Sequence, residues 1–89
     1  MTADPDGRID EMSPEPLYRQ LAAILRARIE RGDWQPRTPI PSESQLVDAY
    51  GVSRPTVRHA VAVLVDEGLV VTIPQRGSFV VGQDTAAAD

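Results

Sequence analysis

The strongest constraint on the fold is a three-residue break between two segments of helical periodicity. The apolar residues of these segments are Leu46, Val47, Ala49 and Tyr50 before the break, and Val57, Ala60, Val61, Leu64 and Val65 after it. The break reads Gly51-Val52-Ser53. Glycine adopts the left-handed conformation that ends a helix, and serine can cap the next one. Two helices joined by so short a turn form a helix-turn-helix.

The predicted ends of these two helices follow from capping residues. Ser42 precedes Gln45 by three positions, so the hydroxyl and the amide can each satisfy a free backbone amide at the start of a helix. Ser53 can cap the later helix, in which Pro55 is tolerated because first-turn amides have no helical partner. Gly68 ends that helix, which we place over residues 53–67.

One helix is predicted before this pair and a hairpin after it. The apolar positions of the earlier helix are Leu17, Leu21, Ile24, Leu25 and Ile29, and Gly32 closes it. Two β-rich runs, 69–73 and 78–81, flank the polar tip Pro74-Gln75-Arg76-Gly77. The predicted fold class is therefore α+β, a winged helix-turn-helix of three helices followed by a two-stranded wing.

The start of the third helix carries the residues that indicate a function. Arg54 and Arg58 are one turn apart and lie beside Pro55, Thr56 and His59. Arginine can bind guanine O6 and N7 through two hydrogen bonds, and hydroxyls and helix amides suit phosphate. The pattern predicts a helix that reads the DNA major groove. Taken alone, it also fits a capped surface helix with two solvated arginines.

The net charge of −4 does not exclude DNA, because the charge is unevenly placed. Residues 1–15 hold one arginine and five acidic residues (−4), and residues 84–89 hold two acidic residues (−2). The middle, 16–83, holds eight arginines and six acidic residues (+2). We expect a DNA-binding domain over 16–82 between disordered tails at 1–15 and 83–89, the first a solvated segment or an electrostatic brake on DNA binding.

Composition argues against an enzyme. The 89 residues include no cysteine and one histidine, so neither a disulfide nor a zinc cluster is expected. No paired nucleophile and base is visible, and no metal or cofactor is predicted. No apolar run reaches the length of a signal peptide core or a membrane span, which predicts a cytoplasmic protein without membrane contact.

Several motifs together resemble the GntR family, with a weak leaning to its HutC-like branch. The motifs are Pro16-Leu17-Tyr18 with Gln20-Leu21, Pro39-Ile40-Pro41-Ser42-Glu43 with Leu46, Tyr50-Gly51-Val52-Ser53-Arg54-Pro55-Thr56-Val57-Arg58, Leu64 with Glu67-Gly68-Leu69-Val70, and Arg76-Gly77-Ser78-Phe79-Val80. The resemblance covers about residues 16–82 and implies a sequence-specific transcriptional regulator, most simply a repressor. Carried over by position, Arg54 and Arg58 read bases, and the wing contacts DNA around Gln75 and Arg76.

The expected DNA-binding residues follow from the motifs and the resemblance together. They are Ser42, Ser44, Ser53, Arg54, Pro55, Thr56, Arg58, His59, Gln75, Arg76 and Gly77. Two positions depart from the family pattern. Ser44 stands where relatives usually have arginine, which removes a charged contact, and Pro74-Gln75 replaces a usual Gln-Gly, which argues against deep insertion of the wing.

The expected partner is double-stranded DNA with a palindromic operator. Relatives usually continue into a C-terminal domain that binds ligand and dimerises, whereas this sequence stops at Asp89. It is therefore expected to be a single-domain regulator or a fragment, and a monomer or weak homodimer that pairs on DNA. The alternative function is a protein-interaction module that docks another regulator or RNA polymerase. Salt dependence separates the two, because DNA binding releases counterions.

Two side-chain groups have structural interpretations. Trp34, after the first helix, is expected to close the small core, with base stacking as the alternative. The arginines at 19, 26, 28 and 31 are expected to form a solvated face of that helix.

Overall fold

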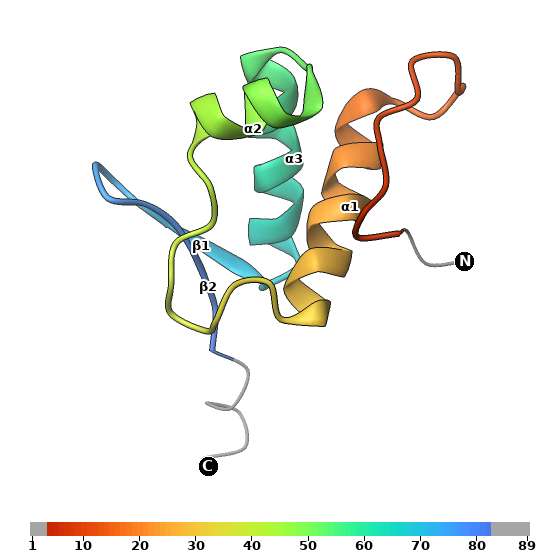
Figure 1. Ribbon diagram of the computed structural model, residues 1–89. Helices are drawn as coiled ribbons and strands as arrows, with labels where there is room; N and C mark the ends of the chain where they lie inside the picture. The colour runs from red at the N-terminus through yellow and green to blue at the C-terminus, as the bar shows by residue number, and fades with distance from the viewer. Residues whose placement is uncertain (1–3, 83–89) are drawn as a thin grey trace.

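The computed structural model describes residues 4–82 and contains three helices followed by a hairpin. The elements are α1 (Leu17–Arg31), α2 (Glu43–Tyr50), α3 (Arg54–Asp66), β1 (Val70–Ile73) and β2 (Gly77–Val80). In Figure 1, α1 and α3 lie side by side, α2 lies near the start of α3, and the hairpin projects on the side of α3 away from α1. This is the predicted winged helix-turn-helix. The tail expected at 83–89 lies outside the described residues.

Capping sets the helix boundaries, as the sequence predicts. The Ser42 hydroxyl accepts a hydrogen bond from the backbone amide of Gln45 at 3.1 Å, and the Gln45 side chain accepts one from the amide of Ser42 at 2.8 Å. Gly51 ends α2 with a φ of +67°. Ser53 then caps α3 by accepting a hydrogen bond from the amide of Thr56 at 3.2 Å. The turn therefore fixes where α3 begins.

The core lies where all five elements meet. Its fully buried large side chains are Leu21, Leu25, Leu46, Val57, Leu64 and Val70. The apolar side of α3 packs on α1 and α2, so its opposite side faces outward.

The wing is an antiparallel hairpin held against the helices by a third segment. Val70 pairs with Val80, and the hairpin bounds differ from the predicted ones by a single residue at three of the four strand ends. Residues 37–40 run along the free edge of β2. The amide of Ile40 donates to the carbonyl of Ser78 at 2.9 Å, and the amide of Val80 donates to Thr38 at 3.0 Å. This segment fixes the wing relative to α2, and it lies in a stretch without periodicity.

Residues 4–15 lie along α1, which differs from the expected disordered tail. The Gln20 side chain accepts a hydrogen bond from the amide of Asp10 at 2.8 Å and donates to the carbonyls of Asp10 and Glu15 at 3.0 and 2.8 Å. Ile9 packs against the core. Ile24 of α1 is 4% exposed and lies beneath Gly7, outside the core cluster. Covering this apolar side chain removes it from water, and that burial stabilises the ordered segment.

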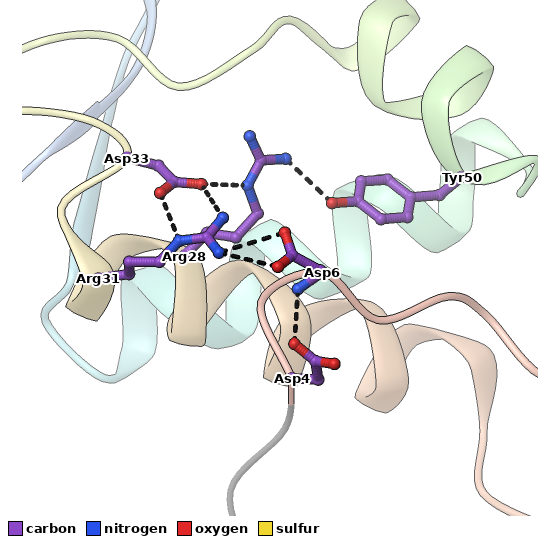
Figure 2. Close-up of polar contacts among 6 residues, drawn as sticks. All are labelled: Asp4, Asp6, Arg28, Arg31, Asp33 and Tyr50. Carbon is purple, nitrogen blue, oxygen red and sulfur yellow. Dashed lines mark hydrogen bonds and ion pairs between the residues drawn. The ribbon is translucent and has the colours of Figure 1, made fainter.

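A polar network ties this segment to the end of α1 and to α2 (Figure 2). Arg31 contacts Asp6 at 3.1 Å and Asp33 at 2.8 Å. Arg28 contacts Asp33 at 2.8 Å and donates to the Tyr50 hydroxyl at 3.0 Å. Hydrogen bonds from Arg31 first, and then from Arg28, hold the pKa of the Asp33 carboxyl well below its usual value.

The arginines of α1 are therefore more engaged than a solvated face would be. The guanidinium of Arg28 lies 4.4 Å from the centre of the Trp34 ring, which packs on the core as predicted. Arg26 forms an ion pair with Glu67 at 2.7 Å and joins α1 to the end of α3. These arginines hold elements together, and the expectation of a solvated face is wrong for them.

Candidate nucleic-acid interface

The outward side of α3 presents the predicted recognition residues. Burial of Val57 and Ala60 fixes how the helix is turned about its axis. Arg54, Arg58 and His59 are consequently exposed near its N-terminal end. The N-terminal end of α3 is therefore accessible to a macromolecular partner.

A carboxylate from α2 holds both arginine heads. Glu43 Oε1 lies 2.9 Å from Nη1 of Arg54, and Glu43 Oε2 lies 2.6 Å from Nε of Arg58. Nη2 of Arg54 also donates to the Ser44 hydroxyl at 3.3 Å. These hydrogen bonds, with Arg58 contributing most, lower the pKa of the Glu43 carboxyl. Two positive groups and one negative group leave a net positive cluster at the start of α3.

Sequence reasoning missed the role of Glu43. The residue stands directly after the Ser42 cap, in the first turn of α2. Because the turn brings the starts of α2 and α3 together, an acidic residue at that position can meet basic residues in the first turns of α3. The acidic residue after Ser42 is visible in the sequence, but its pairing with the arginines can be recognised only once α2 and α3 are placed in space.

The serine and threonine side chains serve partly as caps. The Ser53 hydroxyl donates to Oγ1 of Thr56 at 2.9 Å in addition to its capping bond. Ser42 and Ser53 are exposed, whereas Thr56 is half-buried. Their hydroxyls lie at the helix starts, where free amides favour anions.

The wing tip is an exposed tight turn. The amide of Arg76 donates to the carbonyl of Ile73 at 3.0 Å, with Pro74 and Gln75 as the central residues. Gln75 has a φ of +65°. Proline second and a positive φ third are typical of a type II turn, in which glycine normally takes the third place. Gln75 thus adopts the conformation that glycine normally takes in this turn.

A groove separates α3 from the wing. Its wall on the helix side includes Ser42, Glu43 and Arg58, and its wall on the wing side includes Gln75 and Arg76. Gly77 also lines it, whereas Ser44, Ser53, Arg54, Pro55, Thr56 and His59 do not. The structure therefore gathers part of the predicted set around one groove and places the rest at the starts of α2 and α3.

His59 has a partner that the sequence did not reveal. Its ring stacks on Tyr18 of α1, with the ring centres 3.5 Å apart and the planes 5° from parallel. The guanidinium of Arg19 lies 5.7 Å from the centre of the Tyr18 ring. The first turn of α1 therefore borders the exposed side of α3.

The exposed helix, its arginines and the adjoining wing match what DNA recognition requires. A helix about 10–12 Å wide fits the major groove, arginine reads base edges, and a wing can contact the neighbouring backbone. Fold and site together define a DNA-binding domain of the winged helix-turn-helix class.

Comparisons with known proteins agree with this class and narrow it. The family model described as bacterial regulatory proteins, gntR family, matches residues 17–80. The chain belongs to this family. It is 43% identical over 72 residues to the transcriptional repressor NagR of Bacillus subtilis (strain 168), covering 81% of this chain and 30% of the relative. It is 40% identical over 68 residues to the histidine utilization repressor of Klebsiella aerogenes, covering 76% of this chain and 28% of the relative.

Solved structures share both sequence and fold with this chain. The AraR DNA-binding domain in complex with operator ORX1 superposes with a TM-score of 0.73 at 35% identity, covering 84% of this chain and 89% of that one. YtrA from Sulfolobus acidocaldarius, a GntR-family transcription factor, gives 0.76 at 32% identity, covering 91% and 85%.

The function class follows from the family and the fold. The chain is a DNA-binding transcription regulator domain and not an enzyme. Nothing in the comparisons favours a protein-docking module. The chain spans about 30% of the length of NagR and 28% of that of the histidine utilization repressor. Within residues 4–82, none of the helices combines the length and apolarity needed to cross a membrane.

Proposed function

We propose that this chain is a sequence-specific repressor that reads the major groove with Arg54 and Arg58. The observation that carries the proposal is the pairing of both guanidinium groups with one carboxylate, at 2.9 and 2.6 Å, on the exposed side of α3. Pre-positioned heads lose less side-chain freedom when they bind base edges. The repressor assignment rests on the names of the relatives, NagR and the histidine utilization repressor.

The remaining predicted residues have supporting roles in this proposal. Ser42, Ser44, Ser53 and Thr56 lie at the helix starts and contact phosphate, with Pro55 and His59 beside them on α3. Gln75, Arg76 and Gly77 form the exposed wing tip and contact the DNA backbone across the groove. Phosphate contacts place the protein on the duplex, and the two arginines supply the sequence preference.

Loss of either recognition arginine should weaken operator binding by roughly 5- to 150-fold, as expected for a lost bidentate base contact. The operator is first selected from a random duplex library with the purified chain, and affinities are then measured by fluorescence anisotropy. Arg54→Ala and Arg58→Ala should each also relax the preference at one base pair. Arg8→Ala removes the same charge from the N-terminal segment and should leave affinity near that of the unsubstituted chain.

Arg76→Ala should behave differently from the substitutions in α3. A lost backbone contact weakens all duplexes alike and flattens the salt dependence by about one unit of slope.

If Arg54→Ala and Arg58→Ala both bind the operator like the unsubstituted chain, α3 is not the reading helix. A reporter gene placed behind the operator then tests repression. Higher reporter expression in the presence of the chain than in its absence would contradict the repressor assignment.

We further infer that two copies of the chain read a palindromic operator and pair on it. In helix-turn-helix regulators the half-sites lie about one helical turn apart. The apolar side of α1 is used within the domain, both by the core and beneath residues 4–15, which leaves little for a large dimer contact. Light scattering should therefore find a monomer or weak dimer alone and two copies on a duplex with two half-sites.

A further inference from the structure

The stacked pair Tyr18–His59 has no role in the core. His59 is exposed and Tyr18 is half-buried, and both lie outside the cluster of buried residues that joins α1 to α3. Parallel rings with centres 3.5 Å apart are in full contact on one face. Within residues 4–82, the nitrogens of the His59 ring make no hydrogen bond, so its polar edge is available to a partner. A ring that is fixed in place and keeps an N–H available can bind a partner.

The place of His59 on α3 indicates what that partner is. Successive residues on a helix are 100° apart, so His59 lies next to Arg58 on the exposed side. Arg58 is directed toward α2 by its contact with Glu43, whereas His59 is held toward α1 by Tyr18. The two side chains therefore mark opposite flanks of the same surface. With the wing beyond Arg58, His59 marks the flank farthest from the wing.

We propose that His59 donates a hydrogen bond to a DNA phosphate at this flank and that Tyr18 is the residue that positions it. The inference rests on the proposed DNA-binding function. A helix in the major groove is bordered by a phosphate strand on each side, and the wing accounts for one of them. Stacking on Tyr18 removes rotamer freedom of the histidine before DNA arrives, so less freedom is lost when a ring N–H of His59 binds the phosphate.

The test separates a positioning role from direct contact by Tyr18. Operator affinity is measured by anisotropy for His59→Ala, Tyr18→Leu, Tyr18→Phe and the double variant His59→Ala/Tyr18→Leu. A hydrogen bond to a charged group predicts a loss of about tenfold for His59→Ala. Tyr18→Leu should lose a similar amount, Tyr18→Phe should bind like the unsubstituted chain because it keeps the ring, and the double variant should be no weaker than His59→Ala.

Three further measurements make the result decisive. Thermal unfolding of each variant shows whether the domain remains folded, and the NMR shift of the His59 ring protons, displaced by the Tyr18 ring current, should revert in Tyr18→Leu and stay in Tyr18→Phe. The loss in His59→Ala should be equal for operator and scrambled duplexes, because phosphate carries no sequence information.

Four outcomes would overturn this inference. Unchanged affinity of His59→Ala removes the phosphate contact. Additive losses in the double variant show that Tyr18 touches DNA on its own. A loss confined to one base pair makes His59 a base reader. If the unsubstituted chain binds no duplex at all, the proposed function fails together with the inference, whereas normal binding with unaffected variants removes the inference alone.

Discussion

At the scale of single residues, Glu43 has two opposite effects on DNA binding: its negative charge repels DNA, and its contacts position two arginines for binding. Its carboxylate lies where DNA would approach, yet it holds Arg54 and Arg58 in place. Glu43→Gln removes the negative charge and keeps the shape, so binding to any duplex at low salt should strengthen. The two arginines then lose their fixed positions, and the ratio of operator to scrambled affinity should fall.

Competition anisotropy at low and moderate salt measures both quantities. Asp48→Asn, which removes an exposed acidic residue from the far end of α2, controls for the change in net charge. A specificity ratio equal to that of the unsubstituted chain would show that Glu43 does not organise the arginines.

Gln75 is a second residue whose conformation can be tested. A positive φ costs a residue with a Cβ about 1 kcal/mol or more relative to glycine. Gln75→Gly should therefore raise the free energy of unfolding by about that amount, less the greater freedom that glycine gives to the unfolded chain. Gln75→Val should lower the unfolding free energy, because a β-branched side chain is poorly suited to this region. Denaturant unfolding checks both, and equal stabilities would contradict the strained turn.

Residue types predicted the caps better than they predicted the side-chain partners. Ser42, Gly51 and Ser53 act as expected, because capping is decided within a few residues of sequence. Glu43 with Arg58, and Tyr18 with His59, are separated by 15 and 41 positions. Such pairs depend on the packing of one helix on another, which local patterns do not encode.

At the scale of elements, the N-terminal segment behaves as part of the domain. Deleting residues 1–12 exposes Ile24 and removes the contacts of Gln20 with Asp10, so stability should fall by about 1–2 kcal/mol, or roughly 5–10 °C in Tm. The helices and wing should remain. Circular dichroism during heating measures the change.

Gln20→Ala provides the matched comparison for this deletion. Its side chain bonds to the backbone of Asp10 and Glu15. The substitution should therefore destabilise the full chain more than it destabilises the chain without residues 1–12, in which only the bond to Glu15 remains. Equal losses in both backgrounds, or a deletion that leaves Tm unchanged, would return the segment to the expected solvated tail.

The order of elements was predictable, whereas the two irregular segments were not. Apolar spacing and glycine positions were enough for three helices and a hairpin, since each signal lies within its own element. Residues 4–15 and 37–40 have no period of their own. The first segment is placed by its contact with Ile24, and the second by hydrogen bonds to the edge of β2. Both contacts depend on how the helices and the hairpin are arranged in space, which local sequence does not encode.

At the scale of the whole molecule, we expect one surface to be responsible for DNA binding. That surface comprises the exposed side of α3, the starts of α2 and α3, and the wing tip. The segment 4–12 lies along α1, on the side away from the wing (Figure 1), and its Asp6 contacts Arg31 in the network at the end of α1 (Figure 2). DNA should contact the surface formed by α3, the start of α2 and the wing tip, and it should leave segment 4–12 and the network around Arg31 and Asp33 untouched.

NMR mapping on the selected operator duplex tests this claim most directly. Backbone amide shifts of the ¹⁵N-labelled chain are followed as the duplex is added. We expect the largest changes at residues 42–45, 53–59 and 75–77, with small changes at 4–12 and 31–33. Changes concentrated along residues 4–12 and α1, with α3 and the wing unaffected, would contradict it.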